Sequence, residues 1–166
     1  IESVTITGVP VYELAIDLED GWNLISGLSE EFNINASVDP GNIIVSNTLY
    51  GYAETYYNSE VLIPGNGYWL RASEDGQIIL NSEATQRMSN INHSLRGKAN
   101  TLTINGMDLY FGIKLSDKDR LSYSLPPKPP SGAFDVRFND GWRIVKDYGE
   151  VEVMPTTETL TIAYDI

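Results

Sequence analysis

The residues that could carry out catalysis are few. The chain has no cysteine and a single histidine, His93, which lies in the polar stretch Asn90–Ser94. Without cysteine there is no thiolate nucleophile, no disulfide and no zinc-thiolate site. A Ser–His–Asp triad needs a histidine as its base, and a histidine in a polar connection is typical of a surface loop without a catalytic role. This inventory predicts a protein that is not an enzyme.

Paired carboxylates could support glycoside hydrolysis, and two adjacent pairs occur, Glu30 with Glu31 and Glu74 with Asp75. Glycosidases need two carboxyl groups that face one another across the scissile bond. Neighbouring residues on a strand point to opposite faces of the sheet. Adjacency therefore argues against a shared catalytic site, and we expect no hydrolase activity.

A calcium site is a weaker alternative, because Asp117-Lys118-Asp119 begins like an acidic calcium loop. The EF-hand pattern fails, since no Gly stands at the sixth position and no Glu at the twelfth. A site built from aspartates and backbone carbonyls is left open, with Asp117 and Asp119 as its candidates. No other cofactor is expected.

A cluster of tyrosines is the best candidate for ligand binding. Sugar rings stack on exposed aromatic faces, and nearby polar groups read their hydroxyls. On an unbroken strand Tyr50, Tyr52 and Tyr56 share one face, and Tyr57 lies on the other. The carbohydrate hypothesis uses six residues: Tyr50, Tyr52, Tyr56, Tyr57, Trp22 and Trp69. The alternative is that these rings fill a small β-sheet core.

Short runs of β-branched and aromatic residues recur along the chain, and several alternate apolar and polar residues with a period of two. Glycine-centred turn dipeptides separate them, as in Asp20-Gly21, Asp75-Gly76, Asn105-Gly106 and Asp140-Gly141. The predicted strands are Ser3–Thr7, Val11–Asp17, Trp22–Ser26, Asn42–Ser46, Thr48–Tyr57, Gly67–Ala72, Gln77–Leu80, Thr101–Asn105, Leu109–Gly112, Ala133–Phe138, Trp142–Lys146, Glu150–Met154 and Thr159–Tyr164.

Other segments interrupt this pattern. Helix signals are thin, and Ser29–Phe32 could begin one short turn. Ser82–Lys98 is polar and without a helical period, which favours a connection. Leu125–Pro130, the Pro-rich strip, contains four prolines that cannot donate to a ladder. It is either a docking strip for an aromatic groove of a partner or, as we favour, a stiff crossover between strands.

These features predict an all-β fold of two small β-sandwich-like modules in series, of the immunoglobulin or jelly-roll kind. The first module covers residues 1–82, a connection covers 83–95, and the second module covers 96–166. A single fused sandwich is the alternative. Pairing of Ser3–Asp17 with the second module would blur the boundary.

The charge balance restricts the partners. The chain has 23 acidic and 11 basic side chains, which gives a formal net charge of −12 at pH 7. Phosphate backbones and anionic membrane surfaces are repelled by such a protein, and no apolar run is long enough to span a bilayer. We therefore expect no nucleic-acid partner and no membrane insertion. Neutral polymers such as polysaccharides remain compatible.

Several motifs resemble β modules of large secreted proteins from bacteria of the Bacteroidetes–Chlorobi type. In the first half these are Gly21–Ser26 and Pro64–Leu70. In the second half the matching stretches are Leu102–Gly106, Leu109–Gly112, Leu125–Pro130 and Gly132–Phe138. The resemblance covers most of the chain in patches and carries over no catalytic residue. It implies a parent protein exported by the type IX pathway, with a separate C-terminal sorting domain.

The function expected from sequence is therefore non-catalytic. The chain is interpreted as an accessory or structural module of a secreted or cell-surface bacterial protein, which spaces or presents neighbouring domains of the same parent chain. The alternative is a carbohydrate-binding module with an exposed Tyr and Trp face.

Overall fold

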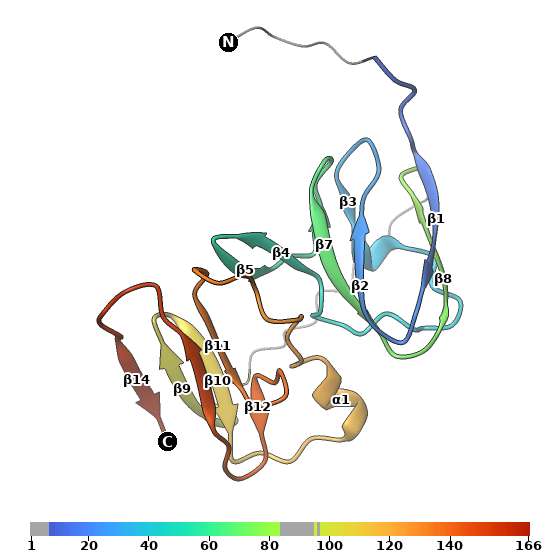
Figure 1. Cartoon of the computed structure of the whole chain (residues 1–166). Helices are drawn as coiled ribbons and strands as arrows, with labels where there is room; N and C mark the ends of the chain where they lie inside the picture. The colour runs from blue at the N-terminus through green and yellow to red at the C-terminus, as the bar shows by residue number, and fades with distance from the viewer. Residues whose placement is uncertain (1–6, 84–94, 96) are drawn as a thin grey trace, which may run out of the picture.

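The structure is a computed structural model that describes residues 7–83, 95 and 97–166 (Figure 1). It is all-β, with one short α-helix and one turn of 3-10 helix in the described part of the chain. The all-β, sandwich-like fold class predicted from the sequence is confirmed. Among the residues described, all strand pairs are antiparallel except that between β10 and β12.

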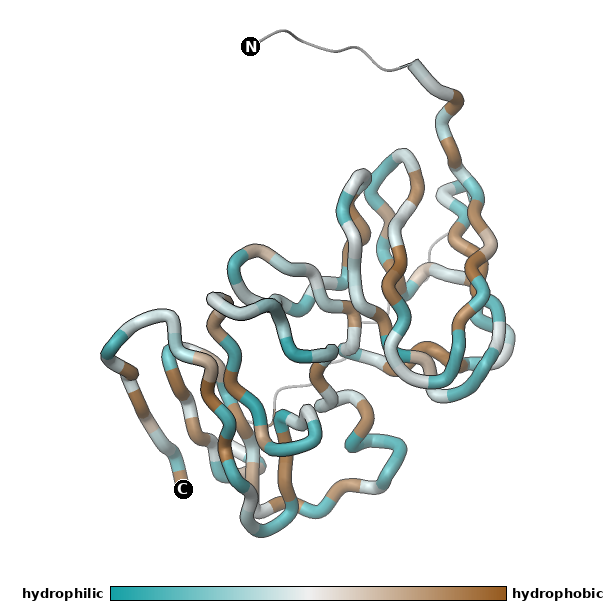
Figure 2. The backbone as a smooth tube through the Cα atoms, in the orientation of Figure 1, coloured by the Kyte–Doolittle hydropathy of each residue, from teal (hydrophilic) through white to brown (hydrophobic). Residues whose placement is uncertain are grey.

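The described part of the first half contains eight strands arranged in three small sheets, with orders β2-β7-β4-β5, β1-β8 and β3-β6. Its elements are β1 (Glu13–Leu18), β2 (Gly21–Ser26), β3 (Phe32–Asn33), the 3-10 turn η1 (Ile34–Ala36), β4 (Tyr50–Ala53), β5 (Thr55–Asn58), β6 (Val61–Leu62), β7 (Gly67–Ala72) and β8 (Gly76–Asn81). Burial alternates along β7 and β8, so one face of each strand packs into the core. In β8 the burial alternates although Ile78, Ile79 and Leu80 are all apolar. Figure 2 shows hydrophobic and hydrophilic residues along the neighbouring strand β1.

The second half is a sandwich of a four-stranded sheet, order β12-β10-β9-β14, and a two-stranded sheet, β11-β13. Its elements are β9 (Asn100–Ile104), β10 (Met107–Phe111), α1 (Asp117–Leu121), β11 (Asp135–Phe138), β12 (Ile144–Val145), β13 (Val151–Met154) and β14 (Ile162–Asp165). The buried core between the two sheets is formed by Ile104, Leu109, Val136 and Phe138. Asn105 and Gly106 both have positive φ, as a tight hairpin turn between β9 and β10 requires.

The strand ladders fall into two sets. Every described ladder joins strands within β1–β8 or within β9–β14. In particular β1 pairs with β8. Residues 13–17 therefore do not pair with the second half, which the sequence had left open as an alternative. The connection predicted at 83–95 lies almost entirely outside the described residues.

Several local predictions were wrong. The expected strand Thr48–Tyr57 is a hairpin, because Glu54 adopts a left-handed φ of 63° and turns the chain between β4 and β5. Residues 42–46 form only an isolated bridge, between Ile44 and Ala72. Asp117-Lys118-Asp119 is not a loop but the start of α1, because the Ser116 side chain accepts a hydrogen bond from the Asp119 N–H and caps the helix.

A buried ion pair holds the Pro-rich strip against β11. Asp135 and Arg137 lie two residues apart and therefore on the same face of the strand, and both are almost fully buried. Arg137 donates to both carboxylate oxygens of Asp135, through Nε and through Nη2 at 2.9 Å. Its Nη1 donates to the carbonyl of Pro126 at 2.9 Å. One guanidinium thus joins the strand to the strip.

We predict that Arg137→Met lowers the free energy of unfolding by about 3–5 kcal/mol, because it leaves the Asp135 carboxylate buried without its partner. Urea denaturation measures this change. The matched control is the double variant Asp135→Leu with Arg137→Met, which removes both charges and should be clearly more stable than the single variant. Equal stability of the two variants would contradict an ion-pair role.

Candidate functional site

Four of the six aromatics predicted to bind a ligand gather where the two halves meet. Tyr50, Tyr56 and Leu125 are buried there together, and Trp22 and Trp69 pack against them. We call these five residues the aromatic seam. Four of them come from the first half, and Leu125 begins the Pro-rich strip of the second. The seam is therefore a shared core and not an open platform.

The β4–β5 hairpin sets the geometry of the seam. Tyr50 pairs with Trp69 of β7, and Tyr52 pairs with Tyr56 across the hairpin. The rings meet edge to face: centroids lie 5.9 Å apart for Trp22 and Tyr50, and 6.3 Å apart for Tyr50 and Tyr56. Such edge-on contacts add to the stabilisation from burial alone.

Hydrogen bonds cross the seam from the first half to carbonyls of the second. The Tyr56 hydroxyl donates to the Pro127 carbonyl at 3.1 Å. The Tyr50 hydroxyl reaches the Ser124 carbonyl at 3.4 Å. Beside them the Thr55 hydroxyl donates to the Phe134 carbonyl at 2.9 Å. Of the three acceptor residues Ser124 is buried, so its carbonyl in particular needs a donor from the protein.

A row of cations and rings extends the contact. The Arg71 guanidinium carbon lies 5.8 Å from the Trp22 ring centroid and 5.9 Å from that of Trp142, so it bridges the halves. The Arg120 guanidinium carbon lies 4.0 Å from the centroid of the same Trp142 ring. Burial lowers the pKa of Arg71, and the charge of Asp20 opposes that shift. Contacts of this kind are stronger when partly shielded from water.

The fate of the predicted sugar-stacking residues follows from this geometry. Tyr50 is 0% exposed and Tyr56 is 7% exposed, so neither ring has a free face for a sugar. Tyr52 and Tyr57 are exposed, but they lie on opposite faces of the hairpin. The Tyr57 ring lies over Gly51, where an added Cβ would come within 2.3 Å of it. Trp22 and Trp69 are half-buried in the seam.

The other candidate residues are dispersed. Asp117 and Asp119 lie in the first turn of α1, where the Asp119 carboxylate accepts a hydrogen bond from the Ser116 hydroxyl at 2.7 Å. Within the described ranges no three acidic or histidine side chains are grouped as a metal site requires. His93 lies outside the described residues. The paired carboxylates Glu30 and Glu31 are exposed.

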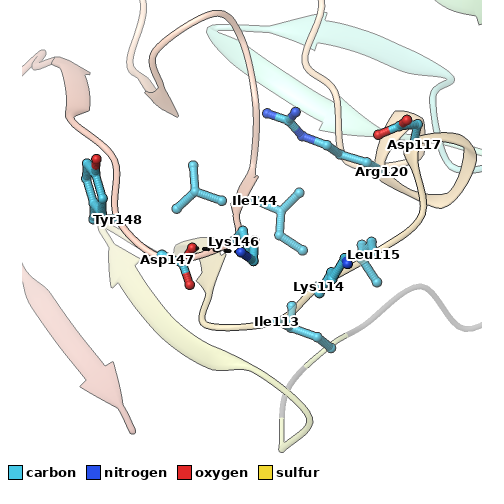
Figure 3. Close-up of a pocket in the computed structure, with 10 residues that line it drawn as sticks. Ile113, Lys114, Leu115, Asp117, Arg120, Ile144, Lys146, Asp147 and Tyr148 are labelled. Carbon is cyan, nitrogen blue, oxygen red and sulfur yellow. Dashed lines mark ion pairs between the residues drawn. The ribbon is translucent and has the colours of Figure 1, made fainter.

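A separate cavity of about 410 Å³ lies between the loop before α1 and the segment that follows β12 (Figure 3). Its apolar lining comes from Ile113, Leu115, Ile144 and Val145. Charged side chains surround this lining. None of the cations of this cavity is a site residue predicted from the sequence. They lie on loops and strand ends that carry no periodic signal, in two segments about thirty positions apart.

Comparison with protein-family models, with curated proteins and with solved structures finds no match to this chain. Among the residues that the structure describes, no helix combines the length and the apolar character needed to cross a bilayer.

We predict that Tyr56→Phe lowers the free energy of unfolding by about 1 kcal/mol, because the Pro127 carbonyl loses its donor. The matched control is Tyr52→Phe, the same chemical change on the same hairpin face, at an exposed ring. Chemical denaturation should show almost no effect for the control. An equal loss in the two variants would refute the role of the cross-seam hydrogen bond.

Alkaline pH should destabilise the protein through the same residue. Burial raises the pKa of Tyr56 above its ordinary value near 10, although a hydrogen bond with Trp69 and the Arg137 charge oppose the shift. The unfolded chain then releases this proton first, so stability is complete below about pH 10 and falls as pH rises toward the folded pKa. Denaturation midpoints measured from pH 8 to 11 should fall less steeply for Tyr56→Phe than for the wild type.

Proposed function

We propose that this chain is a non-catalytic accessory module of a secreted or cell-surface bacterial protein, and that it holds neighbouring domains of the parent chain at a fixed separation. The observation that carries the proposal is the aromatic seam. Two sets of strands that share no ladder are joined by buried rings, side-chain hydrogen bonds and a bridging guanidinium.

Rigidity is the physical property that a spacer requires. Domains within one chain move relative to one another by default, unless their interface is large and hydrophobic. Here the interface has an apolar centre in Tyr50, Tyr56 and Leu125. Its polar tips are directed at particular carbonyls, which fixes orientation as well as proximity. Both features favour a single rigid body over two domains that move independently.

The arrangement of the ends fits the same role. The β1–β8 sheet lies at one end of the molecule and β14 at the other, with the β4–β5 hairpin between them (Figure 1). Domains attached at the two ends would therefore be kept apart. The patchwise resemblance to secreted β modules and the acidic surface, which favours solubility, support an extracellular setting and export of the parent protein by the type IX pathway.

The alternative, a sugar-binding face made from the predicted tyrosines and tryptophans, has weaker support. A stacking platform needs at least two rings on one open face. In the hairpin Tyr52 and Tyr57 are exposed on opposite sides, and the other two rings, Tyr50 and Tyr56, are buried. We therefore assign the aromatics to the seam.

We predict that the wild-type chain unfolds in one transition and scatters X-rays as one rigid elongated body. The double variant Tyr56→Ala with Leu125→Ala removes buried groups of the seam while leaving the separate cores of the two halves intact. It should unfold in two transitions and show a broader distance distribution by small-angle scattering.

The control for this experiment is Ile162→Ala, which truncates a side chain that is 59% exposed on β14 and is paired with β9, away from the seam. It should behave as the wild type in both measurements. A wild-type protein that already unfolds in two steps, or a seam variant with unchanged scattering and a single transition, would refute the rigid-spacer proposal.

A further inference from the structure

We propose that the cavity beside α1 and β12 binds a carboxylate-bearing sugar unit, which would make the chain a receptor for an acidic polysaccharide. This goes beyond the spacer role and does not depend on it. The cavity measures about 410 Å³, which lies within the range of small-molecule sites. Its lining combines an apolar floor with charged groups at the rim, as a site that fixes both a ring and its substituent requires.

The charged residues that line the cavity carry a net positive charge, whereas the protein as a whole is negative. Lys114, Arg120 and Lys146 line the cavity, which is three of the chain's eleven basic side chains, in a protein of net charge −12. Only Asp117 and Asp147 oppose them. A local excess of positive charge on an acidic protein concentrates anions at that point and repels them elsewhere.

Two of these cations are available for a ligand. Lys146 forms an exposed ion pair with Asp147, with Nζ 3.2 Å from the carboxylate oxygen. Among the described residues Lys114 and Arg120 have no carboxylate within ion-pair distance. The Arg120 guanidinium is steadied by the Trp142 ring at 4.0 Å. A guanidinium held in this way can still donate to a carboxylate in its own plane.

The apolar groups suit the body of a sugar. Ile113, Leu115, Ile144 and Val145 form the hydrophobic part of the lining. Tyr148 is 93% exposed, and it lies on the opposite side of the cavity from Arg120 (Figure 3). An exposed ring offers a face for the C–H groups of a pyranose, while the cations on the other side would meet its carboxylate.

Other anions fit the cavity less well. A nucleic acid would place a row of phosphates against the acidic surface outside the rim, where repulsion outweighs the local attraction. An acidic peptide binds an open strand edge through its backbone, but β12 is only two residues long and is already paired with β10. A compact ring with one carboxylate matches both the size and the charge of the lining.

Isothermal titration with a tetragalacturonate, compared with the neutral galactose tetramer, tests the proposal on the full chain. The acidic oligomer should bind, the neutral one should bind at least about tenfold more weakly, and added salt should weaken the acidic oligomer further. The variant Lys114→Gln with Arg120→Gln, which removes the two cations argued to meet the ligand carboxylate, should lose about tenfold in affinity or more. Tyr148→Ala should also weaken binding, without changing the unfolding midpoint.

The matched control is Lys98→Gln with Lys128→Gln, which makes the same change in net charge at exposed positions outside the cavity lining. It should bind the acidic oligomer as the wild type does. Equal loss in this control, equal binding of the neutral oligomer, absence of binding to tetragalacturonate, or equal binding of a tetraglutamate peptide would overturn the proposal. None of these results changes the scattering experiment that tests the spacer role.

Discussion

The Pro-rich strip imposes the constraint around which the rest of the molecule is arranged. A buried backbone must satisfy its carbonyl groups, and a run of prolines has no N–H groups with which to join a ladder. The carbonyls of the buried residues Ser124 and Pro126 therefore need donors from side chains, which Tyr50 and Arg137 supply. Tyr56 adds a donor to the carbonyl of Pro127, an exposed residue of the strip. Phenylalanine at position 50 would fill the same space and remove the donor to the buried Ser124 carbonyl.

This requirement explains why polar-tipped aromatics stand where a purely apolar core could have formed. A Tyr ring contributes apolar area and a directed hydrogen bond at once. The ion pair between Asp135 and Arg137 works in the same direction, since Asp135 orients the guanidinium that binds the Pro126 carbonyl. Contacts of this kind are specific in direction, so they set how the halves are oriented as well as how tightly they adhere.

The surfaces outside the seam divide into two kinds. The chain as a whole carries a net charge of −12, which keeps it apart from other anions. The cavity beside α1 differs, because cations and aliphatic side chains meet there. Its residues lie on short loops carried by β10, α1 and β12, and loops held by a rigid scaffold are the usual place for recognition. A stiff spacer and a ligand site are compatible within one chain.

Local sequence patterns predict the all-β class and several of the strands and turns. The aromatic and apolar run of β7 and the Asn105-Gly106 turn are local patterns that depend on few neighbours, so β7 is predicted with its observed bounds. Local patterns did not reveal the left-handed Glu54 that splits the tyrosine strand, nor the Ser116 cap that makes α1 a helix. Tertiary structure alone decided which rings face water, because Tyr50 and Tyr56 are buried by a strip some seventy positions away. A side chain's type fixes what it can bind, but its exposure depends on what the distant chain places over it.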